Sequence, residues 1–485
     1  MREAAALAFL LLAGCAVGPD FLRPEPPKDA AYTAEPVTAT APAAGEAQHF
    51  AAGQEIPAAW WPLFKSPRLN TLIEQALRAS PNIEAAKAAL AQAHELTLSG
   101  EAAFFPTLQG SAGASRNLTP NATLSPATAT GNPYYSLYTT QLAVSYMPDV
   151  FGGTRRQVES SVAQAEFQRF QLEAAYLTLA SDVVVSVVQE ASLRAQIAAT
   201  QDIIDIESQQ LDVLQHQFEL GGASRAAVLA QAATLAQTRA TLPPLAKQLA
   251  QERNLIATLA GRFPNDPPAE TFELSTLYLP QELPLSLPSR LVEQRPDIRS
   301  AEALLHSASA QVGVATANLL PQITLTGQYG TISTGNPLAG LPVWSIGAGL
   351  TQPLFRGGEL LHARRAAVAA YEEAAAQYRS TVLTAFQNVA DALRALQSDA
   401  DALSAQVVAE RAAADSLDIA RRQFQLGAIN YLLLLNAEQT YQQAHIALVQ
   451  AQANRYADTA ALFQALGGGW WNRRDVAAAN QDGER

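Results

Sequence analysis

Two segments of the chain carry apolar residues at the three- and four-residue spacing of one helix face. The first runs from about Pro67 to Ala103, and its counterpart runs from about Ser289 to Leu319. In the first segment the apolar positions are Leu69, Leu72, Ile73, Ala76 and Leu77. Because a helix cannot continue through a proline without losing a hydrogen bond, the two helices are predicted to end at Pro106 and Pro321.

After these prolines the hydrophobic period changes to two, which is typical of strands with one apolar face. Three alternating runs are clear, and their apolar positions are Leu142, Val144 and Tyr146; Ile323, Leu325, Gly327 and Tyr329; and Trp344, Ile346, Ala348 and Leu350. Residues 107–115 form the weakest strand. Polar, turn-rich stretches connect the strands, so we expect one β-hairpin at about 104–148 and another at about 320–353.

Two further segments, Thr154–Leu220 and Glu359–Leu426, contain no proline and again have the helical spacing. At about 1.5 Å per residue each helix would be about 100 Å long, so it must pack against other helices in an extended array. Each is followed by a turn and a shorter helix, at about Arg225–Leu259 and Tyr431–Leu466. The Pro243-Pro244 pair is expected to break or kink the first of these shorter helices.

The chain contains two copies of one structural half. Pro81-Asn82-Ile83 reappears as Pro296-Asp297-Ile298, and Pro106 reappears as Pro321, in both cases 215 positions later. The ends of the two long helices also match, since Gln217-Phe218-Glu219-Leu220-Gly221 corresponds to Gln423-Phe424-Gln425-Leu426-Gly427. A repeat of this length indicates a duplicated half rather than a short-period solenoid.

These patterns divide the chain into six parts. The expected parts are a signal peptide (1–14), a Pro/Ala-rich leader (15–58), a first repeat (59–261) with its long helix pair at 154–261, a linker (262–288), a second repeat (289–467) with its pair at 359–466, and a polar tail (468–485). For the leader, a disordered tether and an ordered strap along the body both fit its proline-rich composition.

Four strands are too few for a closed membrane barrel, which needs about eight or more. Three chains would supply twelve strands, so we expect the barrel to be shared between subunits. A soluble sandwich and a dimeric coiled-coil rod are the alternatives. Two hairpins make a poor sandwich, and the hairpins at the base of each long helix argue against a simple rod.

The single cysteine, Cys15, follows an apolar run and the small residues Ala13-Gly14. This arrangement resembles the lipobox of bacterial lipoproteins, in which the cysteine is acylated and becomes the new N-terminus; an ordinary signal peptide with an incidental cysteine is the alternative. Ala16 rather than aspartate follows, so outer-membrane sorting is expected. With no second cysteine the exported chain can form no internal disulfide.

Composition argues against two other classes of protein. The net charge of −12, with 44 acidic against 32 Lys and Arg residues, is unlike that of a nucleic-acid-binding protein. The second class is enzymes. The six histidines are scattered and form no HExxH pair. We therefore expect no catalytic residue, no metal site and no cofactor.

Four motifs resemble those of the TolC-type outer-membrane factors, most closely the OprM/NodT-like lipoprotein branch that works with RND efflux pumps. The motifs are the segment Cys15–Phe21, the segment Asp149–Gly152, the run from Arg295 through Gln311–Ala315 to Pro321, and the segment Leu350–Phe355. In the fold that this resemblance implies, an α+β membrane protein forms a homotrimer. Its twelve-stranded outer-membrane β-barrel, in contact with outer-membrane lipid, is continuous with a periplasmic α-helical barrel.

The resemblance also implies a function. Such a channel passively conducts drugs or other small molecules, and its partners are a periplasmic membrane-fusion adaptor and an inner-membrane RND-type pump. The alternatives are an outer-membrane factor for type I protein secretion and a coiled-coil structural lipoprotein without a pore.

In this family the turns between each long helix and its partner meet the adaptor. The corresponding residues here are Leu220, Gly221, Gly222, Ala223 and Ser224 in the first repeat, and Leu426, Gly427, Ala428, Ile429 and Asn430 in the second. The glycines can also be explained as ordinary helix C-caps.

Family members commonly close the periplasmic aperture with aspartates shortly after these turns. Here the corresponding positions are Ala227, Leu433 and Asn436, so an acidic lock is in doubt. An apolar gate formed by Leu432–Leu435 and Asn436 would take its place. Alternatively, most of these leucines simply pack between helices.

Overall fold

The structure, a computed structural model, describes residues 16–27, 31–35, 37–42, 47–118, 134–334, 336 and 338–473. The expected signal peptide and Cys15 lie outside these residues, as does most of the polar tail. The described chain divides into two compact units. Unit 1 contains residues up to 24, 89–169 and 300–378, and unit 2 contains 25–88, 170–299 and 379 onward.

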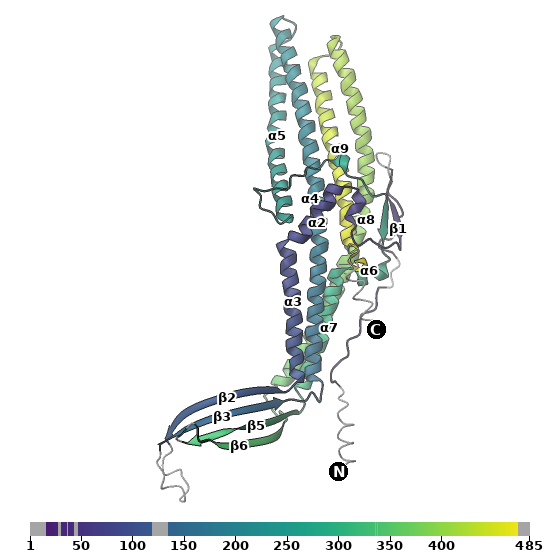
Figure 1. The fold of residues 1–485 in the computed structure, drawn as a ribbon. Coiled ribbons are helices and arrows are strands. Elements are labelled where there is room, and N and C mark those ends of the chain that lie inside the picture. Colours follow the sequence, from purple (N-terminus) through teal and green to yellow (C-terminus); the bar gives the residue numbers. More distant parts are fainter. Residues whose placement is uncertain are drawn as a thin grey trace, which may run out of the picture. The chain divides into compact units, whose positions relative to one another are not determined.

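Unit 1 contains one antiparallel sheet of four strands in the order β2-β3-β5-β6 (Figure 1). The strands are β2 (Thr107–Leu118), β3 (Tyr134–Tyr146), β5 (Gln322–Thr334) and β6 (Leu341–Thr351). Each repeat contributes one hairpin, and β3 of the first hairpin pairs with β5 of the second. Strands β2 and β6 therefore form the two edges of the described sheet.

The register places the apolar positions of the three clear strands on one face. Leu142 of β3 pairs with Tyr329 of β5, which pairs with Trp344 of β6. We call this the apolar face, and its side chains are largely exposed, with Trp344 at 71% and Ile346 at 83%. The opposite, polar face is built mainly of Thr, Ser, Gln and Gly, and no residue on it carries a charge in the described strands.

Each of the two predicted early helices is in fact two helices. The first is α2 (Pro67–Ala79) followed by α3 (Pro81–Glu101), and the second is α6 (Pro288–Gln294) followed by α7 (Pro296–Ala317). Ser80 and Arg295, which precede the second proline in each case, are extended, with ψ of 119° and 125°. A residue before proline is forced out of the helical region, and proline itself is well suited to start the next helix.

The long helices are α4 (Gly153–Glu219) and α8 (Glu359–Gln425), and each has 67 residues. Their partners are α5 (Arg225–Leu259) and α9 (Tyr431–Ala465). Of the break or kink expected in α5, the break is wrong, because one helix runs through Pro243 and Pro244. These prolines remove two donors that would bond the carbonyls of residues 239 and 240. Both of those residues are exposed, so water can satisfy the carbonyls.

Of the described helices, α4 is the one whose length and composition would allow it to cross a membrane, and half of its apolar stretch is buried within the chain. A core helix meets the same criterion, so this feature does not by itself place α4 in a bilayer.

The core of unit 2 includes a cluster of aromatic rings and side chains from the leader residues that belong to this unit. Trp60 stacks on Phe463 with ring centroids 5.0 Å apart. A short parallel sheet joins β1 (His49–Ala52) to β4 (Glu282–Leu285). Single-turn 3-10 helices complete the described elements at Trp61–Phe64, Ala102–Phe104, Leu274–Thr276 and Trp470–Asn472.

The leader segment of unit 2 is tied to α9 by a buried polar network. Arg455, 1% exposed, donates to the side chains of Gln48 and Thr40 at 3.1 and 3.2 Å. Gln48 in turn donates to Thr459 at 3.1 Å. For these leader residues the structure favours the ordered strap over the disordered tether.

Candidate functional site

The turns that end the two long helices have the same backbone structure. Gly221 and Gly427 have φ of 77° and 71°, a left-handed conformation that other residues rarely adopt. The next amides close the turn, because Gly222 donates to the carbonyl of Gln217 at 2.7 Å and Ala428 donates to that of Gln423 at 2.8 Å. This is the hydrogen-bonding pattern of a Schellman C-cap.

Each turn also caps the helix that follows it. The Ser224 hydroxyl accepts from the amide of Ala227 at 3.2 Å, and Asn430 Oδ1 accepts from the amide of Leu433 at 3.1 Å. These caps satisfy amides that the first turn of a helix leaves without a partner. Ala227 and Leu433, the two aperture candidates next to the turns, therefore occupy equivalent positions in the two repeats.

The structure brings the two turns together around one groove in unit 2. The groove has a volume of about 750 Å³. Its lining includes both turns and the aromatic residues behind them, namely Leu214, Gln217, Gly222, Ala223, Ser224, Ala226, Ala227, Ala230, Phe424, Gly427, Ile429, Asn430, Tyr431 and Leu432. Two of the lining residues, Leu214 and Tyr431, form a buried apolar cluster with Leu435, and Ala227 packs against this cluster.

The most exposed apolar side chains of the turns are Leu220 and Leu426, at 87% and 83%. No atom lies within 4 Å of the position that a Cβ on Gly221 or Gly427 would take. The turns therefore present apolar side chains and open backbone, an arrangement suited to contact with another protein.

The leucine run at the start of α9 has two different environments. Leu434 and Leu435 are buried at 1% and 8% exposure, whereas Leu432 and Leu433 are 60% and 53% exposed. Asn436 is also exposed. Helix packing thus accounts for the first pair, while Leu433 and Asn436 remain available for an aperture.

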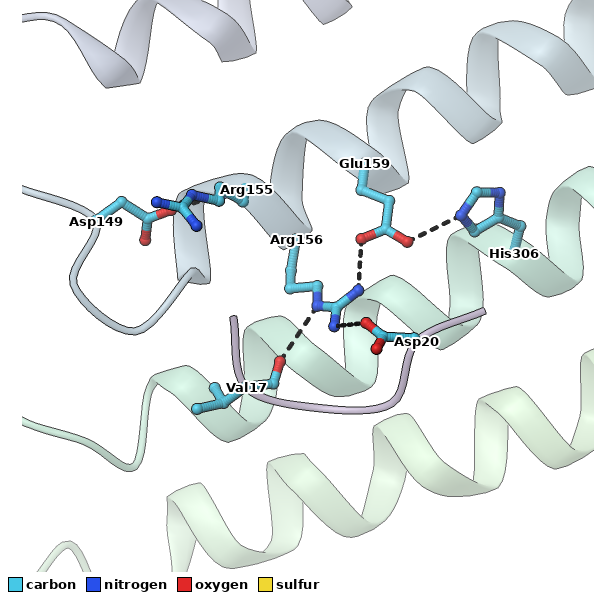
Figure 2. Close-up of polar contacts among 7 residues, drawn as sticks. All are labelled: Val17, Asp20, Asp149, Arg155, Arg156, Glu159 and His306. Carbon is cyan, nitrogen blue, oxygen red and sulfur yellow. Dashed lines mark hydrogen bonds and ion pairs between the residues drawn. The ribbon is translucent and has the colours of Figure 1, made fainter. Parts of the chain in front are cut away.

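In unit 1 the N-terminal segment after Cys15 is fixed against α4 and α7 (Figure 2). The Arg156 side chain, only 6% exposed, donates to Asp20 at 2.6 Å and to Glu159 at 2.8 Å. It also donates to the carbonyl of Val17 at 3.2 Å. His306 of α7 contacts the other oxygen of Glu159 at 2.9 Å. We call this set of contacts the N-terminal clasp.

Two of the sequence motifs meet in the N-terminal clasp. Gly313, from the run that the sequence analysis singled out on α7, packs against Gly18 and Val17 of the leader motif. The ring of Phe21 stacks on His306 with centroids 4.3 Å apart. Sequence reasoning missed Arg156 and Glu159 of α4 and His306 of α7, because no motif includes these three residues as a set.

Among the described residues, no group of three or more His, Cys, Asp or Glu side chains could hold a metal ion. His306 and His445 instead pair with Glu159 and Glu410.

Comparison with known proteins gives a consistent result. The family described as "Outer membrane efflux protein" matches residues 72–262 and 287–468, one match for each repeat. The pyoverdine export outer membrane protein OpmQ of Pseudomonas aeruginosa is 30% identical over 430 residues, covering 86% of this chain and 89% of that protein.

Nodulation protein T of Rhizobium leguminosarum bv. viciae is 29% identical and covers 97% of this chain and 94% of that protein. The solved structure of the outer-membrane channel OprN superimposes with a TM-score of 0.83 at 27% identity, covering 94% of this chain and all of that one. The expected α+β fold, with one hairpin and one long helix pair in each repeat, is confirmed.

Proposed function

Because the chain belongs to the outer membrane efflux protein family, we propose that it is the outer-membrane channel subunit of a tripartite efflux system. In this proposal the channel passively conducts drugs or other small molecules to the outside. An inner-membrane RND-type pump supplies the energy, and a periplasmic membrane-fusion adaptor connects pump and channel. The subunit itself needs no catalytic residue, since it transports without breaking or forming a covalent bond.

The observation that carries the proposal is the open four-stranded sheet. Strands β2 and β6 each pair on one side only in the described chain. An edge strand within a bilayer would leave backbone groups without hydrogen bonds, at a cost of several kcal/mol each. Three copies would join edge to edge into a closed barrel of twelve strands, so we propose a homotrimer.

The two faces of the sheet support the same arrangement. The exposed apolar face, with Trp344 and Ile346, suits contact with outer-membrane lipid. The polar face, with Thr326, Gln328 and Ser345, suits a water-filled lumen. Since the polar face carries no charge in the described strands, we expect the barrel part of the channel to discriminate little between cations and anions.

The proposal is tested on outer-membrane extracts and in planar bilayers. We expect a heat-resistant trimer on gels and stable ion conductance from the purified protein. A monomer or dimer without conductance would instead support the coiled-coil spacer. Deletion of the gene separates efflux from type I secretion. If the deletion strain accumulates drugs while its levels of secreted proteins stay normal, the channel serves efflux.

We propose the two turns as the site of adaptor contact and Leu433, Asn436 and Ala227 as positions near the periplasmic aperture. The shared groove and the exposed Leu220 and Leu426 support this assignment. Replacing both leucines by aspartate should abolish co-purification with the adaptor while leaving trimer and conductance intact. The same double change to methionine, which keeps the apolar surface, is the control.

We also propose that Cys15 carries the lipid anchor of the mature protein. Because the strands should hold the trimer in the membrane independently, Cys15→Ala is expected to weaken anchoring without destroying the trimer. The measurement is the fraction of protein that alkaline carbonate extracts from membranes. A fully soluble variant would contradict the membrane-embedded barrel.

A further inference from the structure

A cluster of buried polar side chains lies in unit 2 where α4, α5, α8 and α9 approach the two turns. Glu207 of α4 and Glu438 of α9 are 1% and 3% exposed, and Gln231 of α5 is fully buried. The first two residues come from different repeats. The cluster is therefore a place where the α4–α5 pair and the α8–α9 pair depend on one another.

The hydrogen bonds within this cluster are incomplete. Thr238 donates to Glu207 Oε1 at 3.1 Å, and Gln231 donates to the backbone carbonyl of Glu207 at 2.8 Å. Five buried side-chain atoms around them have no hydrogen-bond partner, namely Glu207 Oε2, Gln231 Oε1, Arg421 Nη2, the Tyr431 hydroxyl and Glu438 Oε2. A buried carboxylate oxygen without a partner is costly when it carries charge, and the cost falls when the group is protonated.

The charges that act on Glu438 come from two of the other three helices. Helix α8 contributes Arg421, which favours the ionised form of Glu438, and α4 contributes Glu207, which opposes it. Helix α5 contributes only the uncharged Gln231 and Thr238. Arg421 also lines a second groove, separate from the groove at the turns. Near Arg421 in and beside this second groove lie further charged or titratable side chains, which are Asp202, Asp205, Glu410, Asp418, Tyr441 and His445. Asp418 is paired with Arg422 at 2.6 Å and Glu410 with His445 at 3.2 Å. Arg421 still has Glu207, Glu438 and Asp202 nearby and cannot neutralise all three carboxylates.

We propose that this cluster is a proton-sensitive latch: with a proton on Glu438 the two helix pairs stay packed next to the turns, and loss of that proton loosens them. This inference rests on the proposed channel function in one respect only: loosening of the two helix pairs is taken as a step toward opening of the channel. Neither carboxyl needs a second chain to be buried, so the latch belongs to each subunit.

The direction of the pH effect follows from the two environments of Glu438. Burial, together with the charge of Glu207, raises the pKa of Glu438 to about 7 against the pull of Arg421. In an opened, hydrated tip the pKa would return toward the ordinary 4.5. The closed state therefore holds the proton more tightly, so closing is favoured at low pH. The advantage is lost as pH rises from about 4.5 to about 7, and it stays constant above that.

Amide hydrogen exchange of the full-length protein tests the latch without any variant. After correction for intrinsic exchange, protection of the amides of Ala227 and Leu433 should fall at least about tenfold between pH 5 and pH 7.5, since each pH unit between the two pKa values changes the ratio tenfold. Protection that is independent of pH would overturn the proposal.

Two variants give distinct signatures. Glu438→Gln keeps the size of the side chain and cannot ionise, so protection at the tips should fall much less between pH 5 and pH 7.5. The remaining fall comes from Glu207, because burial also raises the pKa of that carboxyl. Glu207→Gln removes the opposing charge, so the fall should be smaller and end at a lower pH. Glu219→Gln, an exposed glutamate at the end of α4, is the matched control and should keep the wild-type profile.

The outcomes separate the latch from the channel. If Glu438→Gln retains the wild-type profile, the latch is wrong whatever the conductance. If the profile behaves as expected but the protein conducts no ions at any pH, the latch stands and the channel proposal fails. Circular dichroism and trimer gels of each variant show whether it is folded, and the wild-type profile decides the matter if a variant is not.

Discussion

At the scale of single residues, the N-terminal clasp depends on the absence of a side chain at Gly313. A Cβ there would lie 2.6 Å from Arg156 Cγ and 3.0 Å from the carbonyl oxygen of Val17. Neither atom can move freely, because Arg156 is held by Asp20 and Glu159 and the other atom is backbone. Gly313 therefore lets the leader approach the backbone of α7 closely.

We therefore expect Gly313→Ala to push the N-terminal segment away from α4 and α7 and to cost about 1–3 kcal/mol, the usual range for overpacking. Limited proteolysis should then cut near Asp20, and the thermal midpoint in detergent should fall. Gly327→Ala is the control, because no atom lies within 4 Å of a Cβ at Gly327. Equal protease resistance of the two variants would show that the leader is not fixed by this contact.

At the scale of helices, each turn at the end of a long helix is stabilised from both sides, by a C-cap on one helix and an N-cap on the next. Ser224→Ala and Asn430→Ala should each cost about 1 kcal/mol, the typical value of an N-cap. Because the caps lie at the tips, the loss should appear as faster hydrogen exchange in the first turns of α5 and α9 and not in unit 1.

The matched control for the first cap is Ser224→Asp, which retains an oxygen that can accept the same hydrogen bond. Its exchange should stay at the wild-type rate. If Ser224→Ala exchanges no faster than Ser224→Asp, the side chain of residue 224 does not cap α5 in solution.

Helices and hairpins also show how far the sequence could be interpreted. The spacing of the apolar residues predicted the ends of the strands and long helices to within a few residues, because each of these elements has one apolar face over many residues. It joined α2 to α3 and α6 to α7, because an apolar stripe continues across Pro81 and Pro296 while the backbone does not. The proline pair Pro243-Pro244 also led to the wrong prediction of a break in α5. The helix continues there because the carbonyls that lose their donors are exposed, so water can bond them.

The candidate site was predictable only in part, for a related reason. The turns are local, so glycine and capping residues identify them. The N-terminal clasp and the buried cluster around Glu207 instead join residues more than 100 positions apart, as with Arg156 and Val17 or Glu207 and Glu438. The apolar stripe does place each glutamate on the buried face of its helix, since Ile203 and Ile204 precede Glu207, and Leu434 and Leu435 precede Glu438, by four and three residues. The stripe does not show that the two carboxyls lie close together.

At the scale of the whole molecule, the decisive question is whether the exposed apolar face of the sheet meets lipid. Ile346 and Ser345 are neighbours on β6, but their side chains lie on opposite faces. Ile346 pairs with Gly327 on the apolar face, and Ser345 pairs with Gln328 on the polar face. The same charged substitution at these two positions therefore compares the two environments directly.

In a membrane barrel, Ile346→Lys should strongly reduce the amount of heat-resistant trimer in the outer membrane, since a lysine facing lipid costs up to about 2–4 kcal/mol near the midplane. Ser345→Lys should assemble at nearly wild-type levels, because its side chain would point into water. Both variants are quantified on the same gels of outer-membrane extracts. A soluble sheet would tolerate a lysine at its exposed position 346, so equal assembly of the two variants would contradict a lipid-facing surface and, with it, the shared barrel.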